Sequence, residues 1–206
     1  LRRATKNYEE LRIDIETLTG KQVTVYGQTE VTKDLYHAVI DSETLILDSV
    51  TDVTLNNLDS HDLTLSGTYQ NELFQVRPKF VVGCDGYRGI SRQAIPKSKR
   101  EEFERVYPFG WLGVLSETKP ADHELIYASH SEGFALCSMR NERLSRYYIQ
   151  CPADDSVENW SDERFWDTLK RQIPESVANN LETGPSIDKS IAPLRSFVCE
   201  PLSHGR

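Results

Sequence analysis

The amino-acid sequence predicts an α+β protein in which short strands outnumber helices. Segments with apolar residues at every second position recur along the chain, as is typical of half-buried strands. Only two longer segments, 29–40 and 162–173, carry apolar residues at helical spacing. These segments do not alternate strictly between strand and helix, so a regular βαβ array is not predicted.

In the first half of the chain, alternating apolar residues over 11–15 and 23–25 predict two strands. A helix is expected over 29–40. Short apolar runs then predict a series of further strands, at 45–47, 55–58, 63–65, 73–76 and 80–82. The polar residues 59–62 separate two of these strands and predict a hairpin turn.

In the second half, apolar and aromatic runs predict strands at 106–114, 125–128, 134–140, 146–150 and 190–198. Ser161 is a suitable N-cap for a helix whose apolar stripe ends before Pro174; the stripe consists of Phe165, Trp166, Leu169 and Ile173. A shorter helix is expected over 175–181. The basic segment 96–100 predicts a domain junction, which divides the chain into residues 1–101 and 102–206.

Composition narrows the possible functions. The chain has 206 residues and a formal net charge of −8, which argues against a nucleic-acid partner. No apolar run approaches the roughly 20 residues of a membrane helix. The histidines and cysteines show no metal-ligand spacing, and no metal is expected. The four cysteines are expected to be reduced core thiols of a cytoplasmic protein: Cys84, Cys137, Cys151 and Cys199.

The segment 80–92 is the most distinctive in the sequence. A predicted buried strand, 80–82, leads into Gly83-x-Asp85-Gly86, and basic residues follow. A tight turn there would present one carboxylate and exposed backbone amides, which can bind a ribose hydroxyl or a pyrophosphate. An Asp-Gly pair alone is more often a plain turn. The preceding apolar run and the trailing Arg88 and Arg92 favour a nucleotide cofactor.

The predicted hairpin 134–150 offers a second candidate site. Alternation places Leu136, Ser138 and Arg140 on one face of the first strand. It places Arg146, Tyr148 and Gln150 on one face of the second strand. If the two faces coincide, they bring together guanidinium and hydroxyl groups that can bind a carboxylate. A solvated polar face explains the same spacing, and spacing alone favours that alternative.

The turn at 83–86 resembles the second fingerprint of the aromatic-ring flavoprotein monooxygenases. Six longer stretches resemble the members that hydroxylate 4-hydroxybenzoate: 23–31, 107–113, 123–127, 133–138, 160–166 and 190–197. The resemblance extends from about residue 13 to residue 206. The chain lacks the GxGxxG motif with which such proteins begin and the Gly-Asp motif that follows later, so an internal piece is expected. That piece would hold part of an FAD-binding α/β domain, joined to a substrate domain with a mixed or antiparallel sheet and flanking helices.

The resemblance implies a catabolic oxidoreductase that uses FAD, NAD(P)H and oxygen to convert 4-hydroxybenzoate into 3,4-dihydroxybenzoate. Attack on the ring is easier when the phenol is ionised, and a phenol has a pKa of about 10. A group that draws the proton away is therefore needed, and Tyr127 matches that position.

The resemblance also implies roles for individual residues. Those that match the carboxylate-binding and neighbouring substrate positions are Ser138, Met139, Arg140 and Tyr148, which reverses the preference for a solvated face. Those that match FAD contacts are Gln28, Asp85 and Arg146. Arg195 and Arg88 match positions near the nicotinamide cofactor, although His is expected in place of Arg88.

A homodimer is the assembly that the resemblance implies. Two alternatives remain at this point. One is a hydroxylase of a related acid such as 4-aminobenzoate, and the other is a non-catalytic fragment that binds aromatic carboxylates. The preference between NADH and NADPH is open.

Overall fold

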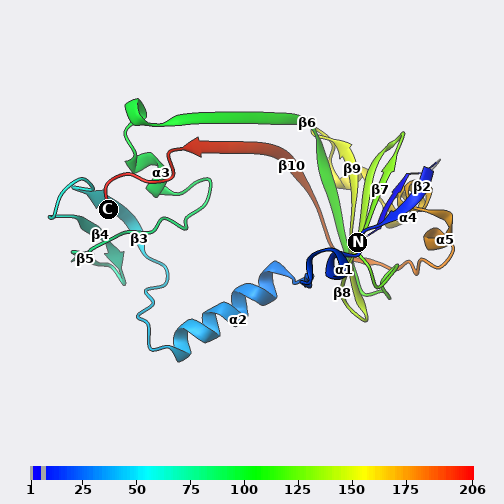
Figure 1. Ribbon diagram of the computed structural model, residues 1–206, viewed down its shortest axis with the longest axis horizontal. Helices are drawn as coiled ribbons and strands as arrows, with labels where there is room; N and C mark the ends of the chain where they lie inside the picture. Colours follow the sequence, from blue (N-terminus) through cyan, green and yellow to red (C-terminus); the bar gives the residue numbers. More distant parts are fainter. Residues whose placement is uncertain (1, 6–7) are drawn as a thin grey trace. The chain divides into compact units, whose positions relative to one another are not determined.

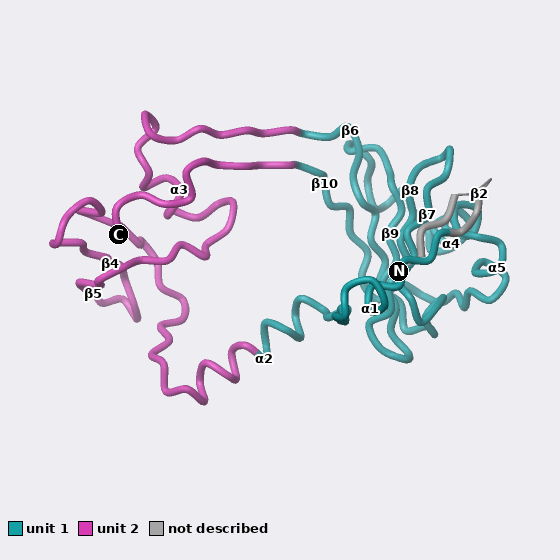
Figure 2. The backbone as a smooth tube through the Cα atoms, in the orientation of Figure 1, with its two compact units in different colours: residues 1–34, 106–195 teal, residues 35–105, 196–206 magenta. Residues whose placement is uncertain are grey.

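The computed structural model describes residues 2–5 and 8–206, and the chain forms two compact units (Figure 2). The first unit comprises residues 1–34 and 106–195, and the second comprises 35–105 and 196–206. Three elements contribute residues to both units: helix α2 (Gln28–Asp41) and strands β6 (Glu101–Ser116) and β10 (Ser186–Glu200). The functional division into 1–101 and 102–206 stays a prediction.

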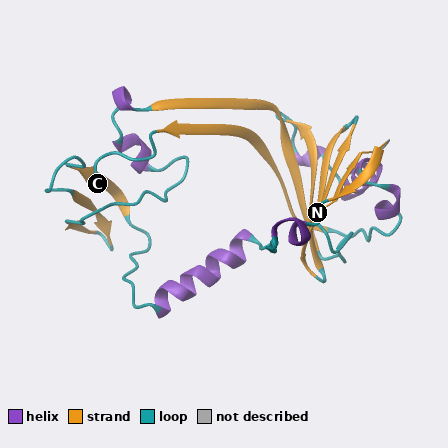
Figure 3. Ribbon diagram, in the orientation of Figure 1, coloured by secondary structure: helices purple, strands orange, loops and turns teal. Residues whose placement is uncertain are grey.

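The first unit is built on a seven-stranded sheet with the order β10-β6-β9-β8-β7-β1-β2 (Figures 1 and 3). Its other strands are β1 (Arg2–Thr5), β2 (Tyr8–Arg12), β7 (Ile126–His130), β8 (Gly133–Asn141) and β9 (Leu144–Pro152). Strand β1 is parallel to β7, whereas β6, β9, β8 and β7 are antiparallel neighbours. The sheet is therefore mixed, and the α+β class is confirmed.

Four short or medium helices accompany this sheet: α1 (Ile15–Thr19), η2 (Val157–Asn159), α4 (Asp162–Gln172) and α5 (Glu175–Ala178). Helix α4 begins as predicted, because the Ser161 hydroxyl accepts a hydrogen bond from the backbone N–H of Arg164 at 3.1 Å. Lys170 and Arg171 lie in its last turn, where positive charge is favourable to the helix dipole.

The predicted apolar stripe of α4 forms the centre of the main core. Phe165 and Leu169 are fully buried against one face of the sheet. The ring of Trp166 lies 5.2 Å from that of Tyr147, in an edge-to-face arrangement. The sheet contributes every second residue of its strands to this core, including Leu112, Val114, Ile126, Ala135, Cys137, Tyr147 and Ile149. The residues between them face the other way.

The second unit contains a three-stranded sheet with the order β3-β4-β5, formed by Thr51–Asn56, Thr64–Tyr69 and Glu72–Val76. The hairpin predicted from the polar residues 59–62 is confirmed. Its turn is stabilised by Asn57, whose side-chain amide donates to the carbonyl of Asp62 at 3.2 Å. The unit also contains α3 (Ile90–Ala94) and the one-turn η1 (Lys97–Lys99) within the predicted basic junction.

Three predicted strands are wrong. Residues 23–25, 45–47 and 80–82 form no strand, and Leu45, Phe80 and Val82 are 81%, 71% and 81% exposed. A strand needs a ladder of backbone hydrogen bonds from a neighbour. For the segment 80–82, the bond that the described residues supply runs from the Val81 N–H to the Arg206 carbonyl at 3.2 Å. Apolar sequence without a neighbouring strand does not form a sheet.

The strand predicted over 11–15 is also corrected, because Ile15 begins helix α1. The Asp14 carboxylate accepts a hydrogen bond from the backbone N–H of Thr17 at 3.0 Å and caps the helix. Gly20 ends it in the left-handed conformation, with φ of 66°. Local capping chemistry therefore overrides the alternation of apolar residues. Among the described residues, no helix has the length and apolar character to cross a membrane.

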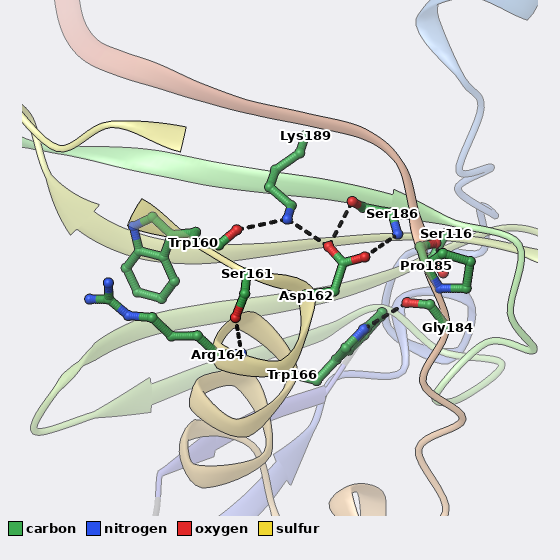
Figure 4. A network of polar contacts seen from close by, with 10 residues as sticks. All are labelled: Ser116, Trp160, Ser161, Asp162, Arg164, Trp166, Gly184, Pro185, Ser186 and Lys189. Carbon is green, nitrogen blue, oxygen red and sulfur yellow. Dashed lines mark hydrogen bonds and ion pairs between the residues drawn. The ribbon is translucent and has the colours of Figure 1, made fainter. Parts of the chain in front are cut away.

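A polar network attaches β10 to the start of α4 (Figure 4). The Asp162 carboxylate accepts hydrogen bonds from the backbone N–H of Ser186 at 2.9 Å and from its hydroxyl at 2.7 Å. The Lys189 ammonium lies 2.6 Å from Asp162 and donates to the Trp160 carbonyl at 2.8 Å. Burial alone would raise the pKa of Asp162, but the hydrogen bonds from Lys189 and Ser186 outweigh it and lower the pKa to about 2.

We expect Asp162→Asn to reduce the free energy of unfolding by about 1 kcal/mol at pH 7, a value already discounted for solvent screening of this partly exposed carboxylate. Because the folded pKa lies below the unfolded value of about 3.9, the stabilisation is present above pH ~4 and is lost as pH falls towards 2. The difference between the two proteins should therefore shrink over that range. Urea unfolding between pH 7 and pH 2.5 measures it.

Glu163→Gln is the matched control, since Glu163 is exposed in the same helical turn. A difference between native protein and Asp162→Asn that stayed constant down to pH 2.5 would contradict the role of the charged carboxylate.

Candidate functional site

Helix α4 covers one face of the sheet of the first unit. The opposite face, called the open face below, includes Leu136, Ser138, Arg146 and Tyr148 of the hairpin β8–β9. Leu136 lies opposite Tyr148 in the register, and Ser138 lies opposite Arg146. Directly opposed residues of antiparallel strands share a face. The two polar faces predicted for the hairpin therefore coincide, which was the condition for a carboxylate-binding wall.

Aromatic rings lie beside this polar patch. Tyr127 on β7 is opposite Leu136 and so shares its face. The ring of Phe134 lies 5.6 Å from that of Tyr127 and 5.1 Å from that of Trp111 on β6. All of these side chains are half-buried. The face therefore combines flat apolar walls with a few polar groups, a composition typical of small-molecule sites.

The remaining predicted substrate residues lie at the end of β8. Ser138 is only 6% exposed, and its hydroxyl donates a long 3.5 Å hydrogen bond to the Met139 carbonyl. The register shifts between Met139 and Asn141, so Arg140 sits in a β-bulge. Alternation no longer determines the face of a bulged residue. Met139 precedes the bulge and pairs with Ser145, so it shares the core-side face of Ala135 and Cys137 and not that of Ser138. The binding roles of Met139 and Arg140 stay predictions.

Arg146 is held by two neighbouring side chains on the open face. Its Nη1 lies 2.5 Å from Oδ2 of Asp188 on β10, and its guanidinium carbon lies 5.2 Å from the centre of the Tyr148 ring. Burial works against the charged guanidinium, but the hydrogen bonds with Asp188 and Tyr148 raise the pKa of Arg146. Its Nε is buried and has no hydrogen-bond partner within the described ranges.

Gly113 supplies the space that this arrangement needs. It lies opposite Tyr148 on β6, and a Cβ atom there would stand 2.8 Å from Nη2 of Arg146 and 2.8 Å from the Tyr148 ring. Only glycine allows both side chains to lie flat across the strand.

The predicted nucleotide turn forms a closed loop before α3. The Asp85 carboxylate accepts a hydrogen bond from the backbone N–H of Ser91 at 2.9 Å, which lowers the pKa of Asp85. A Cβ at Gly89 would lie 1.9 Å from the Asp85 carboxyl carbon, and one at Gly83 would lie 2.4 Å from Cβ of Ser91. The backbone turn itself runs from Gly86 to Gly89, where an N–H to carbonyl bond of 3.2 Å closes it.

The predicted cofactor residues do not all lie in one unit. Gln28 begins α2 and Arg195 lies in β10, both in the first unit, whereas Asp85 and Arg88 belong to the second. Arg146 belongs to the open face of the first unit. The cofactor-binding roles of Gln28, Asp85 and Arg88 stay predictions.

The cysteines are free thiols, as predicted, but they are not all in the core. Cys137, Cys151 and Cys199 are buried, and burial raises the pKa of Cys137 to about 12. Cys84 is exposed, because the segment predicted to be a buried strand before it is not one. No group of metal-ligating side chains occurs among residues that the structure describes.

A hollow of about 560 Å³ lies at α4, and its walls include Gln150, Trp160, Arg164 and Gln172. None of the predicted substrate or cofactor residues lines it. The candidate site is therefore the open face of the sheet.

The family model described as the FAD binding domain matches residues 2–206, and the chain belongs to this family. It is 50% identical over 204 residues to p-hydroxybenzoate hydroxylase from Acinetobacter baylyi, covering 97% of this chain and 50% of that protein. The chain thus spans about half the length of this curated relative.

Solved structures share the fold at low sequence identity. Flavin-dependent brominase Bmp2 is 13% identical with a TM-score of 0.71, over 99% of this chain and 52% of that one. CabE, an aromatic hydroxylase from angucycline biosynthesis, is 14% identical with a TM-score of 0.55, over 87% of this chain and 36% of that one.

Sequence reasoning missed Trp111, Gly113 and Asp188. Alternation along the predicted strand 106–114 could have placed Trp111 and Gly113 on one face. Asp188 is 42 residues from Arg146 in sequence, and no spacing rule connects them.

Proposed function

We propose that the protein containing this chain is an FAD-dependent aromatic monooxygenase that converts 4-hydroxybenzoate into 3,4-dihydroxybenzoate with NAD(P)H and oxygen. The observation that carries the proposal is the open face, where Tyr127, Ser138 and Tyr148 lie beside aromatic rings. The name of the relative with 50% identity supports the same substrate.

The open face offers separate groups for the two ends of such a substrate. The carboxylate would be bound by the Ser138 and Tyr148 hydroxyls with the Arg140 guanidinium, which offers two parallel donors. Phe134 and Trp111 would flank the aromatic ring. Met139 is included on the resemblance alone, because its register partner Ser145 places it on the other face of the sheet.

Tyr127 would act at the phenolic end. Its hydroxyl would hydrogen-bond the substrate phenol and draw the proton away, because the ring is attacked more readily as phenolate. The Phe134 ring contact fixes the Tyr127 side chain from one side.

Bound FAD, reduced by NAD(P)H, would supply the activated oxygen. Gln28 and Asp85 would hold its polar groups, and the Arg146 guanidinium would lie near it. Arg88 and Arg195 would bind the nicotinamide cofactor. The homodimer implied by the resemblance stays a prediction.

The test uses a full-length protein that contains this chain and matches its relatives in length. It is supplied with FAD, and substrate-dependent oxidation of NAD(P)H is measured. We expect 4-hydroxybenzoate to stimulate oxidation and to yield 3,4-dihydroxybenzoate, identified by chromatography. Turnover with 4-aminobenzoate instead would indicate the related hydroxylase, and no product from either acid would contradict the proposal.

A further inference from the structure

The side chain of Arg146 spans three strands. It starts on β9, passes over Gly113 on β6 and reaches Asp188 on β10. These strands are consecutive neighbours in the sheet. A side chain at position 113 would block the path, since its Cβ would lie 2.8 Å from Nη2.

The side chain of Asp188 points to the open face, whereas that of the next residue, Lys189, points to the core side. Successive residues of a strand point to opposite faces. Lys189 pairs with Asp162 on α4, on the core side, and Asp188 pairs with Arg146. The Arg146 side chain is 14% exposed and that of Asp188 is 53% exposed, so the pair lies at the edge of the face where solvent screens it incompletely.

We propose that Asp188 is a positioning and specificity residue of the aromatic-acid site. It holds the Arg146 guanidinium over the Tyr148 ring and cancels its charge, so that the open face favours singly charged aromatic acids over doubly charged ones. This inference rests on the proposed function. Without Asp188 the face would gain one positive charge, and Arg146 would be free to bind a second carboxylate.

The first experiment needs no ligand. In the 206-residue chain, nuclear magnetic resonance of arginine side chains should show slow rotation of the Arg146 guanidinium, because a carboxylate grips one end of it. Asp188→Asn should abolish this slow rotation. Asp167→Asn, a matched change on α4 at the hollow, should preserve it. Unchanged rotation in Asp188→Asn would overturn the positioning role.

The second experiment measures discrimination by calorimetric titration with 4-hydroxybenzoate, the dianion terephthalate and the neutral 4-hydroxybenzamide. Asp188→Asn should improve the affinity for terephthalate relative to 4-hydroxybenzamide by about tenfold, and salt should reduce the gain. The control Asp167→Asn should leave the ratio within about twofold.

The two possible failures are distinguishable. If the native chain binds an acid and Asp188→Asn leaves the ratio unchanged, the inference fails and the proposed function stands. If the native chain binds none of the three compounds, the proposed acid site fails and the specificity role fails with it.

Discussion

Tyr127→Phe is expected to lower the rate of hydroxylation by about 100-fold or more, because it removes the hydroxyl that would draw the proton from the phenol. Affinity for the acid should change by less than about threefold, since the phenyl ring preserves the contact with Phe134. The effect is measured as the rate of product formation at saturating substrate, in the full-length protein that contains this chain.

The dependence on pH identifies the cause of this loss. A variant without the tyrosine hydroxyl should recover rate as pH rises towards the phenol pKa of about 10, where the substrate ionises in solution. Tyr69→Phe, on β4 in the second unit, is the control and should leave the rate unchanged. A Tyr127→Phe protein with the native rate at pH 7 would contradict the assigned role.

Phe165→Ala is expected to reduce the free energy of unfolding by about 3–5 kcal/mol. The side chain is fully buried at the centre of the α4 contact with the sheet, and its ring lies 5.2 Å from that of Trp166. Removal leaves a cavity that the surrounding strands cannot close, since they are fixed by their hydrogen-bond ladder. Urea denaturation followed by tryptophan fluorescence measures the change.

Leu18→Ala is the matched control for this loss. Leu18 is 72% exposed on α1, so its truncation should cost less than about 0.5 kcal/mol. Equal destabilisation by both variants would show that the buried stripe of α4 is not the centre of the core.

The parts of the fold that follow from short-range rules could be predicted from sequence. Helix α4 has a capping serine and an apolar stripe, and both signals act within a few residues. The β8–β9 hairpin has alternation on both strands and a polar loop between them. The shared face of Ser138 and Tyr148 follows once the register is known, because the side-chain period is two.

The parts that depend on distant segments could not be predicted. Segments 45–47 and 80–82 have strand-like sequence but no neighbouring strand in the described chain. The bulge at Arg140 depends on the hydrogen-bond register between β8 and β9, which residue spacing along one strand does not reveal. The pairing of Arg146 with Asp188 requires the strand order β10-β6-β9, which no local pattern encodes.

The opposite directions of Asp188 and Lys189 have a consequence for the alignment of β10. A slip by one residue would turn Lys189 towards Arg146 and Asp188 towards Asp162, which creates two like-charge contacts in place of two ion pairs. The two charges thus disfavour a slip of this strand by one residue. The alignment of β10 also fixes the position of Arg195, which lies seven residues after Asp188 on the same strand.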